Sequence, residues 1–180
     1  VKFEISHSLP ASWTISGTNG QILAFSAVNK NYGTANWTIT GNSTVYLLRS
    51  GATTTDITVN NLDITTTSAL GLHLNTGSGT LPTTSLRVNG NLTINSSSTT
   101  AINWGNTSGN LSAIFLRGNF TQTAGTLVAG TTATNRLRFV NTGVKNYSAS
   151  TTIALTELLV EGGTLDLGSS GLAITAPVTV

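Results

Sequence analysis

A short phrase of alternating apolar and polar residues recurs along the chain. Its first residue is large and apolar in every copy, and its second is polar in all but the last. Its third residue is apolar in every copy but one, where Gly118 stands. This period of two predicts a β-strand with one buried face. The copies begin at Trp13, Trp37, Ile57, Leu86, Leu116, Leu137 and Leu158.

Successive copies start roughly 20–30 residues apart, and a repeat of this length with one supersecondary unit in each copy is typical of solenoids. Three short strands with their turns need about this much chain. We therefore predict an all-β fold, a right-handed and three-sided parallel β-helix of about seven coils.

Two inward columns of stacked side chains follow from this alignment, and they provide most of the predicted stability. In the second column Gly118 leaves a gap that the neighbouring Phe139 fills. The first column holds Trp13, Trp37, Ile57, Leu86, Leu116, Leu137 and Leu158. The second holds Ile15, Ile39, Val59, Val88, Gly118, Phe139 and Val160. One constant offset also aligns Leu72 with Ile102 and Leu86-Arg87 with Leu116-Arg117.

The sequence divides into two parts. Residues 1–12 are predicted to form an N-terminal cap or an added strand, and residues 13–180 to form the β-helix. The segment 172–180 still has the pattern of a strand, and an open last coil exposes core and unpaired strand edge. We therefore expect further coils, or a neighbouring subunit, at this edge.

Composition excludes several classes of protein. Only 8% of the residues are charged, but the chain is rich in Val, Ile and Thr, which favour strands over disorder. The net charge is +2, and basic residues do not cluster with aromatic ones as they do in nucleic-acid-binding proteins. The absence of Cys excludes disulfides and thiolate metal sites. No apolar run approaches the roughly 18 residues of a membrane span.

The residues that carry chemistry are dispersed. Catalysis by carboxylates needs two of them beside one bond, and only Glu157, Glu161 and Asp166 come near each other in sequence. His7 and His73 have no partner at metal-ligand spacing. We therefore expect no catalytic residue, no metal and no cofactor. A carbohydrate-binding or carbohydrate-cleaving module on the same scaffold is the alternative.

Two rows of polar residues are candidate sites. Asn60, Asn89 and Asn119 occupy the fourth place of the phrase, and stacked Asn amides can bond one another along a solenoid. We interpret them as a structural ladder. Arg87, Arg117 and Arg138 occupy the outward second place in three successive coils. They form either an anion- or glycan-binding strip or a row of solvated charges that protects the sheet from edge pairing, and we favour the second.

Runs of Thr and Ser raise a third function, because flat ranks of Thr-x-Thr are typical of ice-binding solenoids. Thr14, Thr38 and Thr58 share a column in our alignment, but Arg87 interrupts it in the next coil. Asn-x-Ser/Thr sequons are also frequent, as expected from the composition, and occur at Asn36, Asn42, Asn91, Asn95, Asn106, Asn110, Asn119 and Asn146.

The stretches Gly90-Asn91-Leu92-Thr93-Ile94-Asn95 and 118–127 resemble the β-solenoid regions of large secreted bacterial surface proteins, of the adhesin and filamentous type. The resemblance covers nearly the whole chain from Trp13 onward. It implies an extracellular or cell-surface location and a structural or adhesive role, as in a filament or surface fibre. We also expect self-association or continuation of the chain at the C-terminal edge, glycans or the cell surface as other partners, and no nucleic acid.

Overall fold

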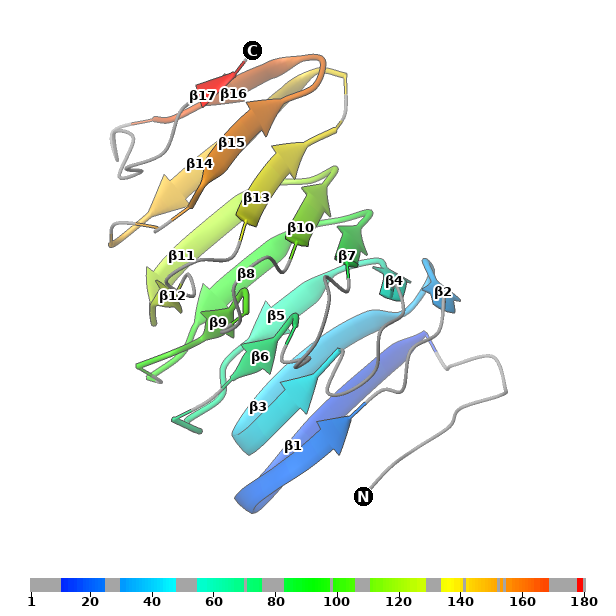
Figure 1. Ribbon diagram of the computed structural model, residues 1–180, viewed down its shortest axis with the longest axis vertical. Coiled ribbons are helices and arrows are strands. Elements are labelled where there is room, and N and C mark those ends of the chain that lie inside the picture. Colours follow the sequence, from blue (N-terminus) through cyan, green and yellow to red (C-terminus); the bar gives the residue numbers. More distant parts are fainter. Residues whose placement is uncertain are drawn as a thin grey trace.

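The chain folds into short parallel strands that stack into an elongated body (Figure 1). The protein is seen here in a computed structural model. It describes residues 11–24, 30–47, 55–69, 71–75, 83–97, 99–105, 111–128, 134–140, 142–151, 153, 155–168 and 178–179. The predicted cap at residues 1–12 lies almost wholly outside them and stays a prediction. No helix of the described residues is long and apolar enough to cross a membrane.

One side of the solenoid is a seven-stranded sheet in which every neighbouring pair is parallel. Its strands occur in reverse chain order, so each coil adds its strand beside that of the previous coil. They are β17 (Val178–Thr179), β15 (Glu157–Val160), β13 (Thr134–Phe139), β10 (Leu111–Leu116), β7 (Thr83–Val88), β4 (Thr55–Val59) and β2 (Lys30–Tyr32).

The other two sides belong to a ten-stranded sheet that bends along β3 (Asn36–Tyr46). The first half of β3 pairs with β5, and its second half pairs with β6. On the second side β1 (Ser12–Ala24) and β3 are followed by β5 (Leu62–Ile64), β8 (Leu92–Asn95), β11 (Phe120–Ala124), β14 (Val144–Ala149) and β16 (Thr164–Asp166). The third side continues from β3 through β6 (Leu72–His73), β9 (Ile102–Asn103) and β12 (Leu127–Val128).

These pairings confirm the all-β class and the parallel β-solenoid. The right-handed winding and the count of about seven coils stay predictions. The pairing of β17 with β15 carries the seven-stranded sheet to Thr179. Whether more coils or a neighbouring subunit follow is likewise still a prediction.

The core consists of stacked columns, but their members differ from the prediction. On the ten-stranded sheet, the columns are Trp13–Trp37–Leu62–Leu92–Phe120–Tyr147 and Ile15–Ile39–Ile64–Ile94–Gln122–Ala149. On the seven-stranded sheet, they are Ile57–Leu86–Ile114–Leu137–Leu158 and Tyr32–Val59–Val88–Leu116–Phe139–Val160. The predicted first column thus joined Trp13 and Trp37, which lie on the ten-stranded sheet, to residues of the seven-stranded sheet. Apolar and polar residues alternate with the same period on every side, so the pattern alone does not separate the sides.

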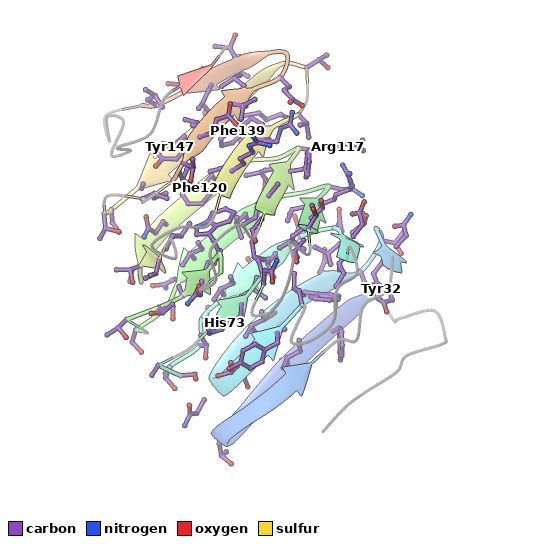
Figure 2. All side chains as sticks on the ribbon, in the orientation of Figure 1. Tyr32, His73, Arg117, Phe120, Phe139 and Tyr147 are labelled. Atoms are coloured by element: carbon purple, nitrogen blue, oxygen red, sulfur yellow. The ribbon has the colours of Figure 1, made fainter. Side chains whose placement is uncertain are left out.

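Aromatic residues occupy the two ends of the core column that begins with Trp13. Trp13 and Trp37 meet edge to face at 5.1 Å between ring centroids. Phe120 and Tyr147, labelled in Figure 2, stack at 5.2 Å between ring centroids. Both arrangements are favourable for aromatic pairs. Trp37, Phe120 and Tyr147 are fully buried. Large rings therefore fill the space that smaller residues fill in the middle coils.

The constant offset that aligned Leu72 with Ile102 and Leu86 with Leu116 in the sequence holds on the third side but not on the seven-stranded sheet. Leu72 pairs with Ile102 as predicted, but Leu86 pairs with Ile114, and Leu116 pairs with Val88. The step from Ile102 to Ile114 is two residues shorter than the step from Leu72 to Leu86. This shorter connection moves the later strand by two residues, which preserves the alternation and so conceals the shift.

Gly118 is not a core residue, contrary to the prediction. It lies at the corner after β10, where a Cβ atom would come within 2.2 Å of the Gly90 carbonyl oxygen. The core place assigned to Gly118 belongs to Leu116, which stacks between Val88 and Phe139. Phe139 therefore has no gap to fill, and Gly118 is needed for the close approach of two backbones.

Candidate functional site

A ladder of asparagines runs along the corner between the seven-stranded sheet and the second side. The side-chain oxygen of each member but the last accepts a hydrogen bond from the backbone N–H of the Asn in the next coil, at 2.8–3.2 Å. These bonds satisfy backbone donors at the corner, where sheet pairing is interrupted. We call this series the Asn ladder; its members are Asn36, Asn61, Asn91, Asn119 and Asn146.

Of the three residues predicted to form the ladder, Asn119 is the one that lies in this series. Asn60 joins it from the side, because its Nδ2 donates to Asn36 Oδ1 at 2.9 Å. Asn89 lies two residues before the ladder member Asn91, and its N–H donates to the carbonyl of Val59. The missed members had a signal in the sequence: most of the ladder residues begin a sequon. The sequons recur because the corner Asn is followed by an inward apolar residue and an outward Thr or Ser.

The corner between the second and third sides is held by buried hydroxyl groups. Thr66 Oγ1 donates to the carbonyls of Gly41 and Ser43 at 2.9 Å, and Ser96 Oγ donates to the carbonyl of Thr66. Thr44 and Ser68 bond through their hydroxyls at 2.8 Å. All of these hydroxyl residues are buried. Part of the Ser/Thr-rich composition thus serves the interior of the solenoid.

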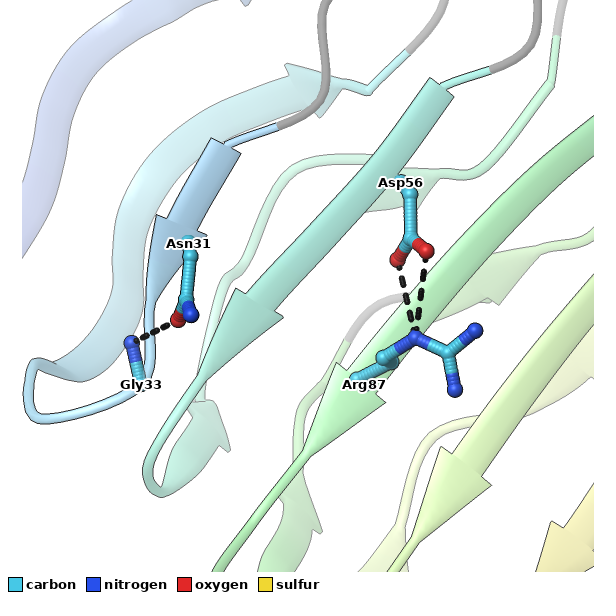
Figure 3. Close-up of polar contacts among 4 residues, drawn as sticks. All are labelled: Asn31, Gly33, Asp56 and Arg87. Carbon is cyan, nitrogen blue, oxygen red and sulfur yellow. Dashed lines mark hydrogen bonds and ion pairs between the residues drawn. The ribbon is translucent and has the colours of Figure 1, made fainter.

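Charged side chains gather on the outer face of the seven-stranded sheet and along its edge. Arg87 Nε lies 3.1 Å from both carboxylate oxygens of Asp56 (Figure 3). Arg136 Nε lies 2.7 Å from Glu157, and Arg138 bonds Glu161. Exposed pairs of this kind each contribute about 0–1 kcal/mol. Carboxylates therefore compensate these three arginines, and we call the three ion pairs the charged face.

Phe115 separates two arginines of the charged face. It pairs in register with Arg87 on one side and Arg138 on the other. The guanidinium carbon of Arg87 lies 4.4 Å from the ring centroid of Phe115, and that of Arg138 lies 5.0 Å away. Cation–π attraction of this geometry contributes about 0.5–1 kcal/mol at exposed sites. Phe115 thus keeps the two arginines two strands apart, which makes their repulsion weaker than in a continuous arginine column.

Arg117 is not a member of that column, contrary to the prediction. Its N–H donates to the carbonyl of Val88, which places it beside Asn89 at the corner. Arg117 is exposed, like Arg87. The predicted strip of Arg87, Arg117 and Arg138 is thus a sandwich of two arginines around Phe115 with the third at its edge.

The outer face of the second side has a different character. Two parallel ranks of short polar residues run across its strands, from one coil to the next. One rank lies on either side of the column that begins with Ile15. Pairing defines the first rank directly, as Thr14, Thr38, Asp63, Thr93, Thr121 and Ser148. The second rank, two residues further along each strand, is Ser16, Thr40, Thr65, Asn95, Thr123 and Ser150. We call this surface the threonine face.

Register explains why the threonine face escaped prediction. Thr14 and Thr38 lie on the second side, whereas Thr58 and Arg87 lie on the seven-stranded sheet. The arginine that interrupted the predicted threonine column therefore belongs to another face. Asp63 is the charged member of the two ranks.

His73 is a buried histidine on the third side. Its ring lies 4.7 Å from that of Tyr46, and only 5% of its surface is exposed. Neither ring nitrogen has a hydrogen-bond partner within the described part of the chain. Burial lowers the pKa of His73 from 6.5 to about 4, so the imidazole is neutral at physiological pH. Burial likewise raises the pKa of Tyr147 to about 12.

Among the described residues, no three His, Asp or Glu side chains gather in a way that could hold a metal ion. No protein-family model matches the chain, and no curated protein or solved structure matches it. Its function is therefore argued from the Asn ladder, the charged face and the threonine face.

Proposed function

We propose that the chain is a stiff structural or adhesive segment of an extracellular protein, of the kind found in bacterial surface fibres and filaments, and that it works without catalysis or a cofactor. The Asn ladder carries this proposal. From Asn36 to Asn146, it adds a hydrogen bond between successive coils at one corner. In every bond the side chain of the earlier Asn accepts from the backbone N–H of the later one.

Stiffness would follow from these contacts along the axis. Each coil is bound to the next by parallel ladders on its sides, by a ladder amide at one corner and by buried hydroxyls at another. Bending or extending the solenoid must break several of these bonds in one coil at once. Stacked repeats of this kind owe their stability to such nearest-neighbour interfaces.

Self-association, or continuation into further coils, belongs to the same proposal. A parallel solenoid ends in a strand whose N–H and C=O groups can pair with an added strand. The addition of one more strand to each side would lengthen the solenoid by one coil without changing its cross-section. A filament or a longer surface protein would use the same contacts that join β15 to β13.

Surface labelling of intact cells of the source organism tests the location. An antibody raised against the 180-residue chain should label intact cells or their fibres. Labelling that appears only after the cells are permeabilised would contradict an extracellular role. Negative-stain microscopy of the same material separates filaments from single rods.

A carbohydrate-binding module is the second candidate, and the charged face favours it. Exposed Arg117 lies at the edge of the Arg87–Phe115–Arg138 sandwich, so guanidinium groups and an aromatic ring are presented together. Arginine recognises carboxylates by paired hydrogen bonds. Binding of acidic oligosaccharides by the immobilised chain, lost in Arg117→Ala but kept in Thr121→Ala, would favour this candidate.

A further inference from the structure

We infer that the threonine face binds the surface of ice. The face presents two ranks of short side chains on parallel strands. Neighbours within a rank are spaced by the strand separation of about 4.8 Å, and the two ranks lie about 6.7 Å apart, twice the rise per residue. The spacing within a rank is close to the shorter repeat of the oxygen atoms in the prism planes of ice.

The chemistry of the ranks suits ordered water better than other ligands. Each Thr or Ser hydroxyl can both donate and accept, and each Thr also carries a methyl group that water surrounds without bonding. Acidic polymers need cations, and the one charge of the two ranks is the carboxylate of Asp63. Protein partners are usually anchored by aromatic or arginine side chains, and the ranks hold none.

The threonine face is also held rigidly, by the packed core on the inner side of its strands and by hydrogen bonds at the corners on both of its edges. Its inward neighbours Ile39, Leu62 and Ile94 have exposed fractions of 0–1%. The Asn ladder fixes the corner before the first rank, and the buried hydroxyls of Thr66 and Ser96 fix the corner after the second. A periodic ligand gains affinity only if the array that meets it is already ordered.

Two places depart from a regular array. Asp63 stands in the first rank between Thr38 and Thr93. The second rank shifts near Thr123, where the pairing of β8 and β11 is irregular. The first rank is therefore the better ordered of the two, and it offers the sharper test.

Partition into a slowly growing ice hemisphere tests the inference with the full 180-residue chain carrying a fluorescent label. The chain should enter the ice, and Thr121→Tyr, in the first rank between Thr93 and Ser148, should lower its uptake several-fold. The matched control is Thr58→Tyr, which places the same ring on the outer face of the seven-stranded sheet, away from the threonine face. This variant should leave uptake unchanged. Circular dichroism of each variant shows whether it is folded.

A gain-of-function variant keeps the test decisive if Thr121→Tyr fails to fold. Asp63→Thr completes the first rank and should raise uptake several-fold. Exclusion of the unmodified chain from ice overturns the inference, and so does equal uptake by the unmodified chain and both tyrosine variants. Sedimentation adds one further contrary outcome: a dimer that Thr121→Tyr dissociates, without ice uptake, would assign the face to a second copy of the chain.

Discussion

The side-chain oxygen of Asn91 accepts a hydrogen bond of 2.9 Å from the backbone N–H of Asn119, one coil further along. Asn91 in turn donates its own backbone N–H to Asn61 at 2.8 Å. Each ladder residue thus joins two neighbouring coils. Substitution of one member removes the acceptor that it offers to the next coil, whereas its own backbone N–H can still bond the previous coil.

Asn91→Ala should lower the free energy of unfolding by about 1 kcal/mol, because the N–H of Asn119 loses its acceptor at an exposed corner. Urea denaturation measures the change. Asn91→Asp keeps an acceptor oxygen and should cost less. Asn95→Ala is the matched control, since Asn95 is an exposed Asn at the end of β8, the strand that follows Asn91, and lies outside the ladder. Equal losses in Asn91→Ala and Asn95→Ala would show that the ladder adds nothing to stability.

Gly118→Ala should destabilise the fold by about 1–3 kcal/mol, because the added methyl group meets the backbone of Gly90. Gly33→Ala is the control. There a Cβ would meet side-chain ends, the nearest being Asn31 Oδ1, which can move aside (Figure 3). Its effect should stay within about 0.5 kcal/mol. If Gly118→Ala were as stable as the unmodified chain in thermal melts, the two corners could not lie as close as described.

Leu116→Asp should abolish cooperative unfolding or lower stability by more than about 4 kcal/mol, because it buries an unpaired carboxylate. Thr121→Asp, on the outer face of the second side, is the control and should cost about 1 kcal/mol or less. Both variants are compared by their thermal midpoints. A small effect at Leu116 would place that side chain outside the core.

Acid should destabilise the protein through His73. Its pKa is lower in the folded state than in the unfolded chain, so the unfolded state binds the proton first as the pH falls. Stability should therefore decline below about pH 6.5 and lose about 3 kcal/mol by pH 4 from this group. Its in-register neighbours, Tyr46 and Asn103, carry no charge that could offset this loss.

His73→Phe keeps a ring beside Tyr46 and removes the titration. The difference between the pH–stability curves of the two proteins, measured with urea between pH 4 and 7, should follow the decline expected of His73. Parallel curves would show that His73 is solvated in the folded protein. Stability should also fall above pH 10, since burial raises the pKa of Tyr147 to about 12.

The sequence predicted which residues form strands better than it predicted which strands meet. Alternation identified Ile57–Val59 and Trp37–Ile39 as strands with inward residues, and both are so. It could not say that they lie on different sides, because the period is two on every side. The side depends on corner length, which varies from two residues between Val59 and Leu62 to three between Val88 and Leu92.

The candidate sites were predictable to different degrees. A ladder of corner amides was expected in kind, and the recurring sequence Asn–apolar–Thr could have identified Asn36, Asn91 and Asn119 as members. The sandwich around Phe115 and the threonine face depend on register between coils. Register follows from connection lengths in three dimensions, and one sequence carries no direct record of it.

Engineered cysteine pairs test the register of the stacked coils most directly, because the natural chain has no cysteine to interfere. Ser85 pairs with Ala113 on adjacent parallel strands, a separation within the Cα distances of about 4.4–6.8 Å that disulfides span. The variant Ser85→Cys/Ala113→Cys should therefore oxidise to an intramolecular disulfide that mass spectrometry detects. Ser85→Cys/Phe115→Cys, which follows the constant offset suggested by the sequence, should stay reduced under the same conditions. Cross-linking of the second pair instead of the first would contradict the register on which the Asn ladder, the charged face and the threonine face depend.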